Sequence, residues 1–251
     1  MWLYGCGADS PAGKIVDSDI PNIVLFDYNS GRGDQVIVDY LDGYDGYMHA
    51  DGYPGYHKTQ ATIVGCWAHA RRKFTDAQKA MGKNKSGKIN WAINHIKKLY
   101  RVETLIKDKN IDERYHIRQE QSLPLLNEFK TWLIQSKSQV LGQTDLSDAI
   151  QYCLNQWEKL ERYTLDGRLS IDNNRAERSI KPFVNGRKAW LLSQTAKGAK
   201  ASAILYSTVE SAKANGLVPY DYITHLLEAF TQPEPDIEQL LPWNVKLGDG
   251  L

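Results

Sequence analysis

The spacing of hydrophobic and polar residues is strand-like at the beginning of the chain and helical in the middle. The runs WLYGCGA and NIVLFDY predict strands, because each is a short apolar stretch between turn-rich segments. GYMHADGY and TIVGCW predict two further strands, and the first of these is expected to end at Asp51. Residues 32–41 favour a short helix. The first third of the chain therefore predicts a small mixed sheet.

From His69 to about Glu161 the apolar residues recur at helical spacing, as in the series Ile89, Ile93, Ile96 and Tyr100. Such stripes are typical of a buried core rather than of a cofactor site. Beyond them, Asp172 predicts the start of a helix that ends near Pro182. KAWLLS then predicts a strand, AKGAKASAILYSTVESAKANG predicts an amphipathic helix closing at Gly216, and TQPEPDIEQ predicts a linker to a short tail.

Composition indicates a globular protein, with 251 residues of which 42% are hydrophobic and 24% charged. The sequence contains no run of roughly 18 apolar residues, and its first residues lack the pattern of a signal peptide. Its cysteines, Cys6, Cys66 and Cys153, are odd in number and widely spaced, which does not indicate a disulfide framework. We therefore expect a cytoplasmic protein with no membrane contact.

The net charge of +1 conceals a separation of acidic and basic blocks. Residues 1–65 hold nine Asp and three Lys or Arg, whereas residues 71–109 hold twelve basic and three acidic residues. Residues 171–200 are again basic, and residues 219–251 are acidic. This partition fits a polyanion bound along part of the surface and acids gathered elsewhere around metal ions, although solvated lysine-rich helix faces would give the same pattern.

Three short segments contain candidate chemistry. Asp51 is expected at the carboxyl edge of a sheet, followed by glycines that allow a sharp turn, although an Asp before Gly is commonly only a turn residue. Glu177 lies one turn into the helix that Asp172 or Asn173 is expected to cap, among cations that would equally pair with it on a solvated face. The Cys66-x-x-His69 spacing suggests zinc, but no second ligand pair accompanies it.

In this order, four stretches resemble the insertion-sequence-66 family of bacterial transposases. They are YLDGYDGYMHADGYPGYHK, GCWAHARRKF, SIDNNRAERSIKPFVNGRKAWLLS with the following GAKASAILYSTVESAKANGL, and LLPWN. The family belongs to the DDE class, so the resemblance implies an RNase H-like mixed sheet flanked by helices. It divides the chain into a first core part (1–74), an all-helical insertion (75–165), a second core part with the Glu-bearing helix (166–217) and a C-terminal tail segment (218–251).

By this resemblance the chain is a catalytic core for metal-dependent cleavage and transfer of DNA. Asp51 would be the second catalytic acid and Glu177 the third, with their carboxylates within about 8 Å, both ligating Mg²⁺ or Mn²⁺, with two ions in the complete site. The partners implied are transposon ends, target DNA and, in the full-length form, further copies of the chain. Cations expected to hold DNA phosphates are Arg71, Arg72, Lys73, Arg175, Arg178, Lys181, Arg187 and Lys188. Trp190 would stack on a base or fill the core.

The sequence departs from the family pattern at the first catalytic Asp. That residue is expected on a strand before MWLYG, so the chain resembles an amino-terminally truncated member. Asp27 is the strand-borne acid upstream of Asp51, and we interpret it as structural. We therefore expect no cleavage by this chain alone, and one alternative is an inactive remnant that only binds DNA or a partner protein. Another is an unrelated metal-dependent nuclease, which DNNRAER and LLPWN disfavour.

Overall fold

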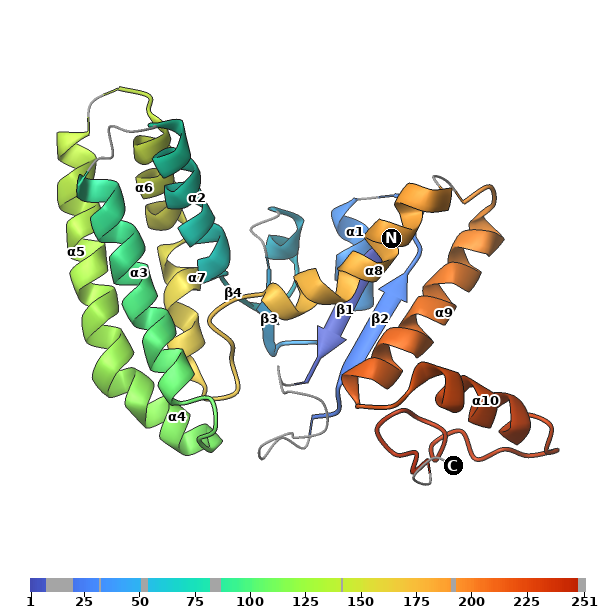
Figure 1. The fold of residues 1–251 in the computed structure, drawn as a ribbon. Coiled ribbons are helices and arrows are strands. Elements are labelled where there is room, and N and C mark those ends of the chain that lie inside the picture. The colour runs from blue at the N-terminus through green and yellow to red at the C-terminus, as the bar shows by residue number, and fades with distance from the viewer. Residues whose placement is uncertain are drawn as a thin grey trace. The chain divides into compact units, whose positions relative to one another are not determined.

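The computed structural model describes residues 1–7, 20–31, 33–50, 54–81, 87–140, 142–190 and 193–247, and its ribbon is drawn in Figure 1. The described residues are mainly helical, with two small two-stranded sheets, so the fold is mixed α/β. The chain divides into two compact units. One comprises Met1–Arg32 and Arg175–Leu251, and the other comprises Gly33–Asn174.

The first unit is built on an antiparallel strand pair, β1 (Trp2–Cys6) and β2 (Ile23–Asp27). Trp2 lies opposite Asp27, and Cys6 lies opposite Ile23. Helices α8 (Asn174–Trp190), α9 (Ala196–Ala214) and α10 (Pro219–Ala229) complete the unit. Its small core contains buried Val24, Phe26 and Ala203, against which pack the side chains of Met1, Leu3, Tyr28, Ile180, Phe183, Tyr206 and Ala214.

Helix α9 lies along β2 and bonds to its backbone through serine side chains. The Ser211 hydroxyl accepts from the Val24 amide at 3.0 Å and donates to the Val24 carbonyl at 2.9 Å. One helical turn earlier, the Ser207 hydroxyl accepts from the Phe26 amide at 2.8 Å. Ser207 and Ser211 are four residues apart in a helix, a rise of about 6 Å, and Val24 and Phe26 are two residues apart in a strand, a rise of about 6.6 Å. The two spacings match, so each serine reaches one of these strand residues. Side chains of α9 therefore supply hydrogen-bond partners for backbone groups on the edge of β2 that faces away from β1.

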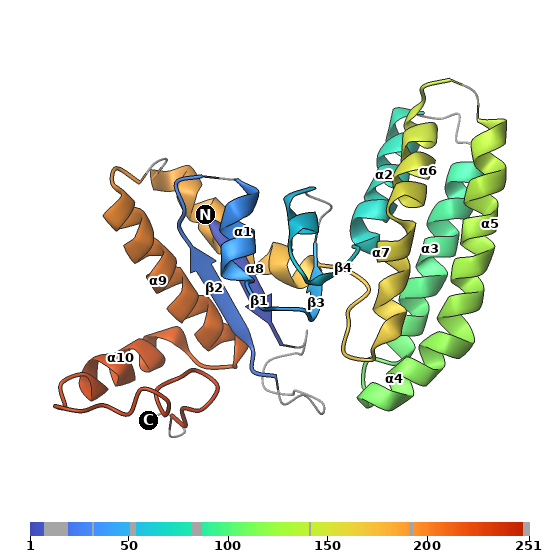
Figure 2. The same ribbon diagram turned by 180° about the vertical axis from the view of Figure 1, so that it is seen from behind.

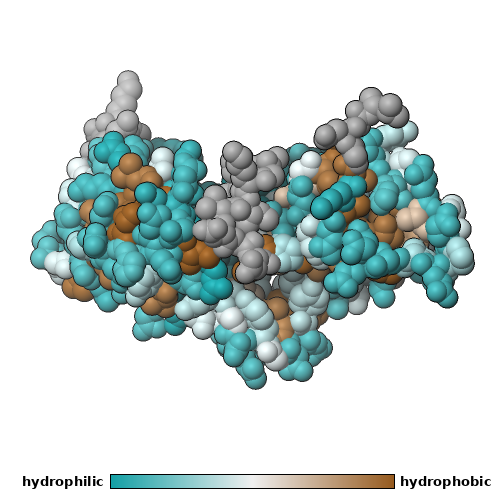
Figure 3. All heavy atoms as spheres, turned by 90° about the horizontal axis from the view of Figure 1, so that it is seen from below, coloured by the Kyte–Doolittle hydropathy of each residue, from teal (hydrophilic) through white to brown (hydrophobic). Residues whose placement is uncertain are grey.

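This contact decides which face of α9 is buried. Ala199 and Ala203 are buried toward the strands, whereas Ile204 and Leu205 are more than 60% exposed. Small side chains face β2 because a serine hydroxyl reaches the strand backbone only when the helix axis comes close. The sequence predicted an amphipathic helix here, but its large apolar residues lie on the outer face. On the face of the molecule drawn in Figure 3, apolar residues form small patches within a largely hydrophilic surface.

The end of α9 and the segment after it follow local rules. Gly216, with φ of 77°, ends the helix in the left-handed conformation that glycine adopts without strain, as the sequence predicted. Helix α10 begins with Pro219 at its first turn and was not predicted from the sequence. The predicted linker, residues 231–239, contains turns without a regular helix or strand. The Tyr222 hydroxyl donates to the Leu240 carbonyl at 2.7 Å and so attaches the tail to α10.

The second unit begins with a helix and a parallel strand pair. The helix α1 (Asp34–Tyr40) confirms the predicted short helix. The strands β3 (Tyr47–His49) and β4 (Thr62–Val64) pair in parallel and are connected through the short 3-10 helix η1 (Pro54–Lys58). The described strands therefore form two separate pairs, and a single RNase H-like sheet stays a prediction.

A bundle of helices follows the strands. Its long members are α2 (Trp67–Ala80), α3 (Gly87–Leu105), α5 (Leu123–Gln139) and α6 (Asp145–Asn155), which lie side by side in Figures 1 and 2. Shorter elements are α4 (Ile111–Ile117), η2 (Arg118–Ser122), α7 (Trp157–Glu161) and η3 (Arg162–Leu165). The predicted stripe residues Ile89, Ile93 and Ile96 are buried. Trp67 lies at the centre with no exposed surface, stacked edge-on against Trp157.

A buried arginine joins the bundle to the segment that follows it. Arg118, in the π-helical turn η2, has no exposed side-chain surface and forms a bidentate ion pair with Glu103, with distances of 2.9 and 2.6 Å. The same guanidinium donates to the carbonyls of Tyr163, Asp166 and Leu169 at 2.8–3.0 Å. Arg118 therefore fixes residues 163–169, which lead directly to the start of α8.

Helix α8 corrects two predictions. The sequence predicted a helix ending near Pro182 and a strand at KAWLLS, but α8 continues through Pro182 to Trp190, and Leu191 and Leu192 lie outside the described residues. An interior proline costs about 3 kcal/mol because it removes a backbone hydrogen bond. Packing outweighs this cost: Phe183, just beyond the proline, contacts the rings of Phe26 and Tyr206 at centroid distances of 5.9 and 5.3 Å.

Replacing Arg118 should strongly destabilise the protein. Arg118→Met leaves the Glu103 carboxylate and three carbonyls without their donor, and removing one partner of a buried ion pair costs about 3–5 kcal/mol. We expect a loss of that size in the free energy of unfolding from urea titration. The control is Arg168→Met, which removes a bidentate pair with Asp166 in which the arginine is 54% exposed. That variant should lose less than about 1 kcal/mol, and equal losses would contradict the special role of Arg118.

Candidate functional site

The start of α8 is fixed by the side chain of Asp172. One carboxylate oxygen accepts from the Asn174 backbone amide at 3.0 Å, and the other accepts from the Asn174 side chain at 2.7 Å. The first amides of a helix have no partner within the helix, so a carboxylate there stabilises the helix start. The sequence predicted this role for Asp172 or Asn173, and the structure shows Asp172 in it.

Asp172 is itself held by the helical bundle. The Tyr100 hydroxyl, from α3, donates to the second carboxylate oxygen at 2.8 Å. Burial, reinforced by the nearby Asp172 carboxylate, raises the pKa of Tyr100, so its phenol stays protonated and donates. From the sequence, Tyr100 was expected only as part of a core stripe. The sequence could not indicate a partner for its hydroxyl, because that partner is 72 residues away.

The segment before α8 also contacts the corner between β4 and α2. The Asn173 amide donates to the Cys66 sulfur at 3.3 Å, and the Trp67 amide donates to the Ile171 carbonyl at 3.1 Å. Burial raises the pKa of the Cys66 thiol, which favours the neutral form. Cys66 therefore packs in the interior and accepts a hydrogen bond from the residue just before α8.

His49, at the end of β3, lies close to the same segment. Both of its ring nitrogens are buried without a hydrogen-bond partner among the described residues. Burial lowers its pKa to about 4, although the Asp172 carboxylate opposes the shift. The imidazole is therefore neutral at pH 7. No motif in the sequence indicated His49.

Glu177 lies in the first turn of α8 and is half-buried. At about 100° per residue, it shares one side of the helix with three exposed cations. Ile180 and Phe183, which pack on the core of the first unit, lie about 60° and 120° around the helix from Glu177 in the other direction. The structure therefore places the carboxylate in a basic stripe of α8, defined as Arg178, Lys181 and Lys188.

The other predicted cations differ in their surroundings. Arg175 donates to the Cys6 carbonyl at 2.6 Å and to the Asn22 side chain at 3.0 Å, which holds it against the ends of β1 and β2. Arg187 is also exposed on α8, but it lies about 80° from Glu177 on the flank that bears Ile180, away from the basic stripe. Three more cations, Arg71, Arg72 and Lys73, are exposed near the start of α2, and the Lys73 ammonium lies 5.6 Å from the centre of the Tyr152 ring.

Asp51 and the side chain of Trp190 lie outside the described residues, and so does the expected approach of Asp51 to Glu177. Within the described part of the chain, no three His, Cys, Asp or Glu side chains are grouped closely enough to hold a metal ion. Those residues alone therefore do not form the expected metal centre, which depends on Asp51. None of the helices in the described ranges is both long and apolar enough to cross a membrane.

Comparison with known proteins identifies the family. The model of the IS66 transposase family matches residues 1–201, and that of the IS66 C-terminal element matches residues 207–243. The chain therefore belongs to the IS66 transposase family, which confirms the resemblance seen in the motifs.

Curated relatives come from Sinorhizobium fredii (strain NBRC 101917 / NGR234). The chain is 32% identical to the uncharacterized protein y4qI over 260 residues, which cover 98% of this chain and 47% of the relative. It is 31% identical to the uncharacterized protein y4jD over 240 residues, which cover 90% and 46%. The chain thus spans about half the length of these relatives. No solved structure matches it.

The bond between Tyr100 and Asp172 should couple the bundle to the start of α8. We predict that Tyr100→Phe and Asp172→Ala each lower the free energy of unfolding by about 1–3 kcal/mol, because each leaves a partly buried polar group without its partner. The double variant should lose less than the sum, with a coupling of about 0.5–3 kcal/mol, measured by urea unfolding in a double-mutant cycle. Tyr115→Phe, at an exposed tyrosine of α4, is the control. Strict additivity would show that the bond does not link the two segments.

Proposed function

We propose that the chain is part of the catalytic core of a transposase that cuts and joins DNA at the ends of an insertion sequence. The family match over residues 1–201 and 207–243 carries this proposal. In this interpretation residues 1–74 and 166–217 belong to an RNase H-like core of the DDE class. Residues 75–165 are an insertion within that core, and residues 218–251 are a tail.

Asp51 and Glu177 are the proposed catalytic and metal-binding carboxylates. Carboxylate oxygens are the donors that Mg²⁺ and Mn²⁺ prefer, and two such ions when bound would supply Lewis acid chemistry for phosphodiester cleavage. The placement of Glu177 one turn into a helix fixed by Asp172 supports its part of the proposal. A defined helix start limits the positions open to a carboxylate in the first turn, which metal binding requires.

The exposed cations are the proposed contacts to DNA. Phosphate contacts hold a duplex without reading its sequence, and they release counterions when they form. The basic stripe of α8 supports this role because its cations lie beside Glu177 on one side of the helix. The exposed group Arg71, Arg72 and Lys73 is a second proposed phosphate contact.

Removing cations from the basic stripe should make DNA binding less sensitive to salt. For the double variant Lys181→Gln and Lys188→Gln, the slope of log affinity against log salt should weaken by about 0.9 for each DNA phosphate that the protein no longer neutralises. Fluorescence anisotropy with a labelled duplex over a series of salt concentrations measures this slope. The matched control is Lys137→Gln, an exposed lysine of α5 outside the proposed surface. A slope unchanged in the double variant would show that the stripe is only a solvated helix face.

Metal binding should require both proposed carboxylates. We expect Asp51→Asn and Glu177→Gln each to weaken Mn²⁺ binding by about tenfold or more, because each removes an anionic oxygen ligand. Paramagnetic resonance of free Mn²⁺ during titration measures the affinity. Asp27→Asn, at the end of β2, is the control and should bind Mn²⁺ as the unchanged protein does. If only Asp27→Asn weakened Mn²⁺ binding, the metal ligand would be Asp27 and not Asp51 or Glu177.

A further inference from the structure

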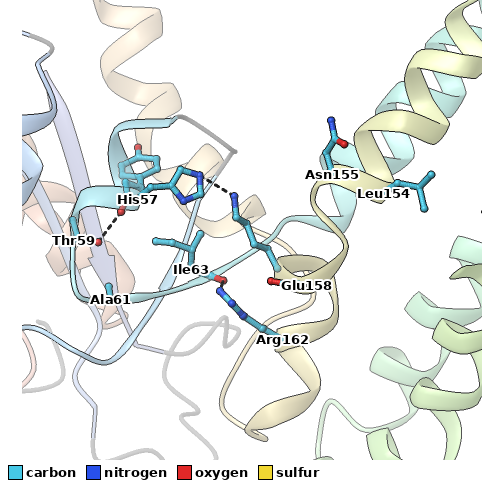
Figure 4. A pocket seen from close by; sticks show the side chains of 10 residues that line it. His57, Thr59, Ala61, Ile63, Leu154, Asn155, Glu158 and Arg162 are labelled. Atoms are coloured by element: carbon cyan, nitrogen blue, oxygen red, sulfur yellow. Dashed lines mark hydrogen bonds between the residues drawn. The ribbon is translucent and has the colours of Figure 1, made fainter.

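A separate cavity of about 470 Å³ lies within the Gly33–Asn174 unit. Its walls come from η1 and β4 on one side and from the end of α6, α7 and the start of η3 on the other (Figure 4). The residues that give it chemical character are His57, Glu158, Lys159 and Arg162. None of them was singled out from the sequence.

The cavity contains more positive than negative charge. Lys159 and Arg162 are its cations, and Glu158 is the carboxylate among its lining residues. Within the described part of the chain, neither cation forms an ion pair with a carboxylate. Burial lowers the pKa of Lys159, and the neighbouring Arg162 lowers it further, although Glu158 opposes them. An anion bound here would stabilise the charged form of Lys159 and so oppose the lowering of its pKa.

Lys159 and His57, which line the cavity from different elements, are in contact. The Lys159 ammonium lies 3.0 Å from Nε2 of His57, and the contact is drawn as a dashed line in Figure 4. An ammonium only donates, so Nε2 accepts and the remaining ring proton is on Nδ1. The pair therefore holds the ammonium in place and leaves donors on both residues.

The backbone around these cations is fixed. Arg162 donates through one terminal nitrogen to the Ile63 carbonyl at 2.9 Å, which orients its planar guanidinium. The Gly65 amide donates to the Lys159 carbonyl at 2.8 Å, and a Cβ on Gly65 would lie 3.0 Å from the Leu160 nitrogen. Only a residue without a side chain allows β4 and α7 to approach this closely. The donors are thus held in place before any ligand arrives.

We propose that this cavity binds a single phosphate group through Lys159, Arg162 and His57. Donors from three elements, η1, α7 and η3, suit a tetrahedral anion with several acceptor oxygens better than a planar carboxylate with two. The phosphate comes either from DNA, in which case the inference rests on the proposed function, or from free phosphate.

Titration of the full chain with inorganic phosphate tests the site without DNA. Isothermal calorimetry should show saturable binding that Lys159→Met weakens by about tenfold or more, since a charged donor is lost. Glu158→Gln should bind phosphate several-fold more tightly, because it removes the carboxylate that repels the anion. Lys137→Met should bind as the unchanged protein does, and thermal melts confirm that each variant is folded.

Three results would overturn the proposal: no saturable phosphate binding, unchanged binding in Lys159→Met, or weaker binding in Glu158→Gln. Competition separates the two sources of phosphate. If DNA is the source, inorganic phosphate should displace a labelled duplex from the unchanged protein, and Lys159→Met should reduce that competition. If free phosphate is the ligand, it should bind without displacing the duplex. Failure of the salt-slope experiment alone would affect only the proposed function.

Discussion

The buried guanidinium of Arg118 is the interaction on which the Gly33–Asn174 unit depends. It satisfies the Glu103 carboxylate of α3 and accounts for hydrogen bonds to three carbonyls within residues 163–169. A charge with no exposed surface is tolerated only when its donors are used and its counter-charge lies close by. The π-helical turn at residues 118–122 places the side chain where these groups converge, in accord with the tendency of such turns to occur at special sites.

The consequences of that interaction extend along the chain to the start of α8. Residues 163–169 are fixed by Arg118, and the next few residues bond to Cys66, Trp67 and Tyr100. Asp172 then supplies the first amide of α8 with an acceptor. The first amide of α8, that of Asn174, is therefore satisfied by the last of a series of polar contacts that begins in the helical bundle.

The first unit depends on hydrogen bonds between a helix and a strand edge. A two-stranded sheet leaves an unpaired edge on each strand, and exposed edges invite pairing with other chains. Here α9 covers the outer edge of β2 with two serine hydroxyls, and it brings its alanines toward the strands to come close enough. The same close approach leaves Ile204 and Leu205 on the outside. Hydrogen bonding to the strand, rather than burial of the largest apolar residues, orients this helix.

The sequence alone determined the structural features that depend on residues close together in the chain. Helical stripes in the bundle, the short helix at residues 34–40, the role of Asp172 and the end of α9 near Gly216 all follow local spacing, capping and glycine geometry. Four short motifs were enough to indicate the family. The same local rules failed at Pro182, where they predicted a helix end that packing of Phe183 overrides.

Only the tertiary structure decided which distant polar groups meet. The serine contacts of α9 join residues 181 and 187 positions apart, Arg118 reaches carbonyls 45 to 51 positions away, and the Lys159–His57 contact spans 102 positions. A serine, an arginine or a lysine gives the same local signal whether it is solvated or paired across the fold. Its role is fixed only when folding removes water from it and brings one partner within hydrogen-bond distance.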